Sequence, residues 1–152
     1  MRITARADYA VRAVVELACA GGDGMLTAEV ISCRQDMPRT FLLGILGELR
    51  RAGVVASVRG STGGWRLARP PEAVTLAMVV RAVEGPLARV SEARPEDASY
   101  QGAAAPLQLV WIALRDSIRE VLEHVTIAHL ASGELPEQVL ARTRDTDAWQ
   151  SR

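Results

Sequence analysis

One arginine precedes four small residues and could bring its charge close to a polyanion. The segment runs Arg59-Gly-Ser-Thr-Gly-Gly64. The Arg59 guanidinium can project past a thin backbone into a narrow minor groove, where the negative potential of DNA is focused. The hydroxyls of Ser61 and Thr62, and the backbone N–H groups around Gly60 and Gly63, suit phosphate oxygens. These residue types predict contacts with the DNA backbone and the minor groove.

A second group of residues could read base edges. Arg39 can pair with guanine O6 and N7 or with a phosphate, and Thr40 can meet a phosphate or a thymine methyl group. Leu43 and Gly44 follow one turn later. A recognition helix needs exposed residues of this kind in its first half, where it enters the major groove. The candidate DNA-facing set is completed by Thr27, Pro38, Arg51 and Ser57.

The helix that carries these residues is predicted from Pro38 to about Ala52, with Gly53 as its left-handed stop. Its buried face is predicted from five apolar residues at helical spacing: Phe41, Leu42, Ile45, Leu46 and Leu49. Gly44 and Gly47 each lower helix propensity by roughly 1 kcal/mol relative to Ala. Close approach of another backbone, such as the sugar-phosphate chain of DNA, would explain that cost.

The elements around this helix complete a recognisable order. Two helices precede it, with Thr4 and Thr27 as N-caps. Residues 54–58 and 65–68 form a hairpin around the glycine-rich segment, in which Gly60, Gly63 and Gly64 are free to adopt positive φ. A fourth helix, residues 76–84, follows the cap Thr75. The fold class predicted is mainly α with a small β-hairpin wing, a winged helix-turn-helix.

The second half of the chain is predicted to form a loop and a long helix. Residues 86–106 contain three prolines and an acidic patch. Residues 107–130 then repeat apolar side chains at alternating spacings of four and three, which is a heptad seam. Such a helix would span roughly 36 Å, and a second copy of the chain could bury the seam. The predicted dimer interface is Leu107, Trp111, Leu114, Ile118, Val121 and Val125.

The chain therefore divides into four predicted segments. Residues 1–85 form the DNA-binding domain, 86–106 the loop, 107–131 the dimerisation helix, and 132–152 a short helix with a polar tail. At 152 residues, the chain fits either one compact domain or one small domain with an oligomerisation arm. Residues 1–69 carry ten Arg and six acids, a charge of +4, whereas residues 70–152 carry eight Arg and twelve acids, a charge of −4. The first part is the half expected to face DNA.

Several other classes of protein are not favoured. No apolar run is long enough to span a bilayer, and the N-terminus lacks a signal-peptide core, which predicts a cytoplasmic protein without membrane partners. The glycine-rich run lacks the ending of a nucleotide-binding loop. His124 and His129 do not share a helix face, so no metal pair is expected. Nothing supports an enzyme or a bound cofactor. Cys19 and Cys33 are either packed small hydrophobes or a thiol switch.

Three stretches resemble one known family. They are residues 1–13 (MRITARADYAVRA), 38–55 (PRTFLLGILGELRRAGVV) and 57–68 (SVRGSTGGWRLA). Together they are similar to the Rrf2 family of bacterial transcription regulators, which includes regulators of the IscR, NsrR and CymR type. The resemblance covers residues 1–85 closely and the long helix by its architecture. It implies a homodimer that binds palindromic double-stranded DNA and usually represses. It also implies Arg2 and Thr4 near phosphates, Arg39, Thr40 and Leu43 in the major groove, and Arg59 with Gly60 in the minor groove.

One departure from the family pattern bears on the signal. Many members hold an iron–sulfur cluster with three cysteines in the loop that corresponds to residues 86–106, completed by a residue near the N-terminus of the partner. This loop has no cysteine. Asp8 stands where the fourth ligand can come from, but oxygen ligands alone do not hold such a cluster. The expected signal is then a small-molecule effector in the cleft beside the long helix, a protein partner, or a redox change at Cys19 or Cys33. The alternative function is a protein-interaction or thiol-based redox module with the same fold.

Overall fold

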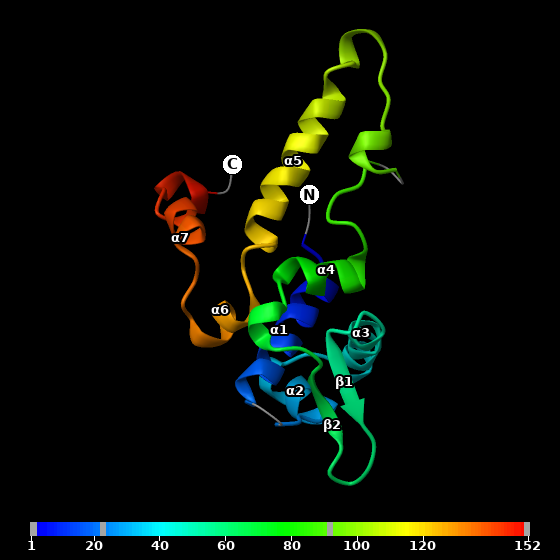
Figure 1. Cartoon of the computed structure of the whole chain (residues 1–152), viewed down its shortest axis with the longest axis vertical. Coiled ribbons are helices and arrows are strands. Elements are labelled where there is room, and N and C mark those ends of the chain that lie inside the picture. The colour runs from blue at the N-terminus through cyan, green and yellow to red at the C-terminus, as the bar shows by residue number, and fades with distance from the viewer. Residues whose placement is uncertain (1–2, 22–23, 91–92, 151–152) are drawn as a thin grey trace.

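The computed structural model describes residues 3–21, 24–90 and 93–150, and it shows a helical lobe from which one long helix rises (Figure 1). The lobe contains α1 (Ala5–Cys19), α2 (Ala28–Gln35), α3 (Arg39–Arg51), β1 (Val55–Val58), β2 (Gly64–Leu67) and α4 (Leu76–Glu84). The other helices are α5 (Leu107–Leu122), α6 (Ile127–Ser132) and α7 (Glu137–Thr143). Single 3-10 turns occur at η1 (Pro71–Ala73), η2 (Pro95–Asp97), η3 (Gly102–Ala104) and η4 (Thr146–Trp149). The expected fold class is confirmed.

Three threonines begin three helices of the lobe, as expected. The Thr4 Oγ1 accepts a hydrogen bond from the Ala7 N–H at 3.0 Å, and Thr27 and Thr75 accept equivalent bonds at 3.2 Å. Each bond satisfies one of the N–H groups that a helix leaves open at its start. At the other end of α3, Gly53 has φ of +70° and stops the helix.

The recognition helix α3 is fixed by its apolar face. Leu42, Ile45, Leu46 and Leu49 are each at most 2% exposed and pack with the buried residues of α1. Phe41 was expected in this face, and that prediction is wrong because its side chain is 43% exposed. It lies at the edge of the stripe, where its ring meets Tyr9 edge-on with centroids 5.8 Å apart.

The wing is an antiparallel hairpin in which Val55 pairs with Leu67 and Val58 with Gly64. Positive φ is correct for Gly60, at +120°, but wrong for Gly63 and Gly64. At these two positions, glycine is needed because a side chain would collide with the backbone of neighbouring residues. A Cβ on Gly63 would lie 2.2 Å from the Val58 carbonyl oxygen, and one on Gly64 would lie 2.9 Å from the Leu26 carbonyl oxygen.

The prediction of one helix over residues 107–130 is wrong. Helix α5 ends at Leu122, and α6 begins at Ile127. Between them the chain pairs with the start of α4: Leu76 N–H donates to the Val125 carbonyl at 2.9 Å, and Ile127 N–H donates to the Val74 carbonyl at 2.8 Å. Val125 is 3% exposed within its own chain, so it is not part of an exposed seam. The sixteen residues of α5 span roughly 24 Å.

Across residues 3–21, 24–90 and 93–150, none of the helices combines the length and the apolar character that crossing a membrane requires.

Candidate nucleic-acid interface

Helix α3 and the wing are joined by one arginine. The Arg50 Nη1 donates a hydrogen bond to the Ser57 Oγ at 3.2 Å, and the guanidinium lies 6.0 Å from the centre of the Trp65 ring. Trp65 in turn exchanges two backbone hydrogen bonds with Leu26, at 2.8 and 3.0 Å. The recognition helix, the hairpin and the segment before α2 are thereby held in one unit.

The first half of α3 presents its candidate base-reading residues to solvent. Arg39, Thr40 and Leu43 are all exposed. The Arg39 Nε forms an ion pair with the Glu29 Oε2 at 2.9 Å, which sequence spacing did not indicate. The two side chains are 60% and 75% exposed, so water screens the pair. The pair is therefore weak and leaves Arg39 exposed to a ligand.

The tip of the wing carries an exposed arginine, Arg59. Arg59, Gly60, Ser61 and Thr62 are exposed, and the Gly63 N–H closes the turn on the Gly60 carbonyl at 3.0 Å. In the part of the chain that the structure describes, no ion pair or hydrogen bond holds the Arg59 guanidinium. This side chain is available to a phosphate or a groove.

The far end of α3 is less positive than its sequence suggests. The Glu48 carboxylate hydrogen-bonds Arg6 of α1 and lies 3.7 Å from the Arg51 Nη2. The hydrogen bond to Glu48 raises the pKa of Arg6 above its ordinary value. Glu48 thus offsets part of the positive charge of Arg6 and Arg51.

The remaining predicted DNA contacts have structural roles within the chain. Thr4 caps α1 and donates to the Glu84 Oε1 at 2.6 Å, Thr27 caps α2, and Pro38 is the N-cap of α3. Arg2 lies outside the described residues. Among the candidate residues, Arg39, Thr40 and Leu43 of α3 and residues 59–62 of the wing tip are exposed and do not cap a helix.

Comparison with known proteins decides the family. The Rrf2 family model, described as "Iron-dependent Transcriptional regulator", matches residues 3–133. The chain belongs to the Rrf2 family. It is 42% identical over 151 residues to a Mycobacterium tuberculosis protein described as "Putative HTH-type transcriptional regulator Rv1287", covering 99% of this chain and 94% of that protein. It is 31% identical to CymR of Bacillus subtilis, covering 87% of this chain and 91% of CymR.

Solved Rrf2-family structures agree with this fold. The structure of CymR, the global cysteine regulator of B. subtilis, superimposes with a TM-score of 0.75 at 30% identity, covering 89% of this chain and 99% of that one. IscR of T. potens gives a TM-score of 0.71 at 26% identity, covering 93% of this chain and 96% of that one. This Rrf2 protein is accordingly a DNA-binding transcription regulator of the winged helix-turn-helix type, and not an enzyme.

The residues of this Rrf2 protein do not fit an iron–sulfur cluster. The segment 86–106 contains no cysteine. Its side chains bind α5 instead: the Trp111 Nε1 donates to the Tyr100 hydroxyl at 3.0 Å, and Arg115 pairs with Glu96. In the described ranges, no three His, Cys, Asp or Glu side chains gather as metal ligands. Asp8 forms an ion pair with Arg12 at 3.1 Å.

The two cysteines are surface residues. Cys19 and Cys33 are both exposed free thiols, so the expectation that they are packed hydrophobes is wrong. Cys19 lines an open groove of about 760 Å³ between the end of α1, η1 and α6. Glu72 and His129 also line it. The groove lies beside the segment that was expected to be the end of the long helix.

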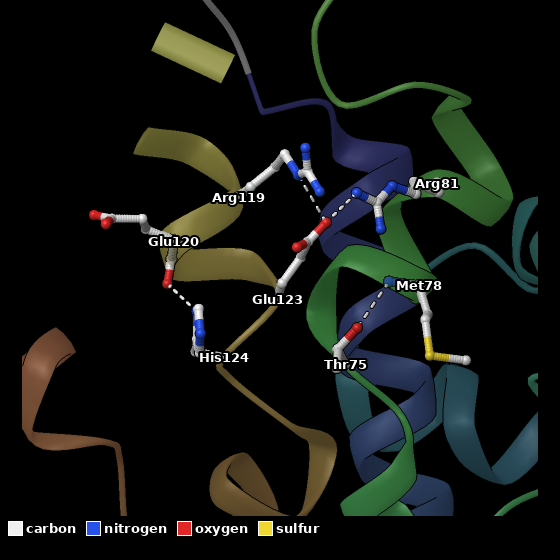
Figure 2. A network of polar contacts seen from close by, with 7 residues as sticks. All are labelled: Thr75, Met78, Arg81, Arg119, Glu120, Glu123 and His124. Carbon is white, nitrogen blue, oxygen red and sulfur yellow. Dashed lines mark hydrogen bonds and ion pairs between the residues drawn. The ribbon is translucent and has the colours of Figure 1, made fainter. Parts of the chain in front are cut away.

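The long helix α5 is attached to the lobe by a carboxylate between two arginines (Figure 2). Glu123 follows α5 and accepts hydrogen bonds from Arg81 of α4 and from Arg119 one turn earlier, the latter at 3.1 Å. These bonds, that from Arg81 foremost, lower the pKa of Glu123. Next to it, the His124 Nδ1 lies 2.8 Å from the Glu120 carbonyl oxygen. These contacts, together with the backbone hydrogen bonds of Leu76 and Ile127, join the end of α5 to the lobe.

Sequence reasoning missed three residues of this interface. From the sequence, Glu29 and Glu48 were only two of the six acids among residues 1–69, and no role was expected for Arg50. Each acts on a partner in another element, at separations of ten, forty-two and seven residues. No motif encodes such pairs. The sequence contains no spacing that indicates them.

Proposed function

We propose that this Rrf2-family protein is a homodimeric repressor at a palindromic promoter site, with α3 in the major groove and Arg59 in the minor groove of each half-site. The observation that carries the proposal is the joint exposure of α3 and the wing tip on one rigid unit. Arg50 links the two elements through Ser57 and Trp65. A winged helix-turn-helix can contact both grooves when the distance between its recognition helix and its wing is fixed.

The homodimer is supported by apolar side chains that α5 leaves in solvent. Leu109, Val110 and Leu114 are 69%, 54% and 40% exposed. Trp111, by contrast, is held by its own loop through Tyr100. An exposed apolar stripe on a projecting helix is stabilised by a second copy of that helix. Two lobes held in this way would face two half-sites.

We propose that the protein responds to its signal without an iron–sulfur cluster, since residues 86–106 contain no cysteine. The groove beside α6 is the proposed site for a small effector, because it touches both the lobe and the segment after α5. An exposed Cys19 at its edge favours thiol chemistry as the second candidate. Replacing both Cys19 and Cys33 with Ser distinguishes the two candidates. If the protein senses through its thiols, this variant should lose its response to oxidant.

The experiment that tests the function is selection of binding sites by the full chain from a random-sequence duplex library at moderate salt. We expect an inverted repeat to be enriched. Arg59→Ala should then lower affinity for it at least several-fold and reduce the salt slope by about one. The matched control is Arg144→Ala, whose arginine pairs with Glu137 on α7. Failure to enrich any sequence, or equal binding by Arg59→Ala, would contradict the proposal.

A further inference from the structure

The outward face of α3 is poor in groups that can form hydrogen bonds with base edges. Opposite the buried residues of this helix lie Thr40, Leu43, Gly44, Gly47 and Arg51. Arg51 is beside Glu48, and Arg39 at the flank is paired with Glu29. The face contains no Asn or Gln, which are the usual bidentate readers of adenine. Base readout by paired hydrogen bonds therefore has few donors and acceptors here.

The centre of this face is apolar and flat. Leu43 is 40% exposed. A Cβ added to Gly44 or to Gly47 would have no atom within 4 Å, so the fold does not require glycine at either position. Without side chains at these two positions, the helix backbone can approach a ligand closely. The Leu43 side chain would then be the first group to meet it.

Leu43 differs in this respect from its exposed neighbour Phe41. The Phe41 ring already packs against Tyr9, and it lies on the side of α3 that faces α1. Leu43 has no such role in the core of the lobe. Burying its free apolar surface would be favourable only against another apolar group. In the major groove, that group is the thymine C5-methyl.

We propose that Leu43 is a specificity-determining residue that reads thymine through its methyl group, while Gly44 and Gly47 allow the close approach that this contact needs. The proposal rests on the function proposed above, because it requires α3 to lie in the major groove. Bases with a polar edge at the same position would leave a hydrogen-bonding group facing Leu43 without a partner, which lowers affinity. The half-site should therefore contain at least one thymine that is recognised by its methyl group.

The test uses the enriched duplex from the site selection, remade with uracil in place of one thymine at a time. Uracil differs from thymine only by the missing methyl group, so hydrogen bonding is unchanged. We expect a loss of about fourfold in affinity at one or two positions of each half-site, the value for one buried methyl group. Leu43→Ala should bind the thymine duplex more weakly and should no longer distinguish thymine from uracil at those positions.

Two controls separate the outcomes. Arg59→Ala should weaken binding to the thymine and uracil duplexes by the same factor, because the wing contacts the other groove. Since Leu43 is exposed, Leu43→Ala should unfold at the temperature of the unchanged protein. Equal affinity for every uracil duplex, or an unchanged preference in Leu43→Ala, would overturn the inference while leaving the proposed function intact. Failure to enrich any site would instead contradict the proposed function.

Discussion

The Glu29 carboxylate lies 2.9 Å from the Arg39 Nε, so an acid of α2 holds the first arginine of the recognition helix. The pair has two consequences for DNA. In the DNA complex proposed above, Glu29 would help to position Arg39 and would place a negative charge near the phosphates. The second effect should dominate in a complex, because the carboxylate is 75% exposed and its attraction for Arg39 is screened.

Glu29→Gln should therefore strengthen DNA binding. The amide can still accept a hydrogen bond from Arg39 but no longer repels phosphate. We expect affinity to rise several-fold, on the order of the ~1 kcal/mol that one charge interaction is worth at 4 Å in water. Fluorescence anisotropy with the selected duplex over a range of salt concentrations measures this. Glu137→Gln, which removes an acid from a similar exposed pair on α7, should change nothing. Weaker binding by Glu29→Gln would mean that orientation of Arg39 matters more.

Gly44→Ala should change protein stability and DNA affinity in opposite directions. Alanine at this open position in the middle of α3 should raise the free energy of unfolding by roughly 0.5–1 kcal/mol. The added methyl group should also keep the helix from the groove and lower DNA affinity. Thermal unfolding and anisotropy on the same sample test both effects. Gly64→Ala is the contrasting variant: its Cβ would lie 2.9 Å from the Leu26 carbonyl oxygen, so it should destabilise the hairpin. Unchanged affinity in Gly44→Ala would exclude close approach.

The contribution of Glu123 should depend on pH. Hydrogen bonds from Arg81 and Arg119 hold its pKa below the usual value of 4.5. A carboxyl group with a lowered folded-state pKa stabilises the fold above its unfolded pKa, and this contribution is lost as the pH falls through the folded-state value. Glu123→Gln should thus lower the unfolding free energy at pH 7 by about 0.5 kcal/mol, a value typical of an exposed pair, and by less at pH 3.

Thermal unfolding at the two pH values measures this difference. The control is Glu72→Gln, which removes an exposed carboxylate on η1 and should have little effect at either pH. If Glu123→Gln lowered the unfolding free energy equally at pH 3 and pH 7, Glu123 would stabilise the fold through packing and not through its charge.

Leu114→Asp should prevent association through α5. Leu114 is 40% exposed and one helical turn from the more exposed Val110. A charge there would be buried on dimerisation at high cost. Sedimentation should show a monomer whose lobe unfolds normally but which binds the inverted repeat far more weakly. Ser99→Asp adds the same charge at an exposed loop position, and this variant should remain a dimer. If Leu114→Asp remained a dimer, the dimer contact would lie on another surface of the protein.

Local chemistry made much of this protein readable from its sequence. Thr4, Thr27 and Thr75 identified three helix starts, because a cap depends only on residues within one turn. The apolar spacing of Leu42 to Leu49 identified the buried face of α3. The glycine-rich segment after Arg59 identified the wing. In each case the interaction that decides the structure lies within a few residues of sequence.

Tertiary structure decided what depends on distant partners. The heptad pattern continued through Val125, yet backbone pairing with Val74 and Leu76 ends α5 before it, because two buried hydrogen bonds and a core position outweigh local helix propensity. Phe41 had the spacing of a core residue but was left at the rim by the position of α1. The same holds for charge: Arg39 and Arg51 are offset by Glu29 and Glu48, whereas no acid among the described residues pairs with Arg59. Which arginines have an acidic partner depends on packing, since these partners meet only in the folded chain.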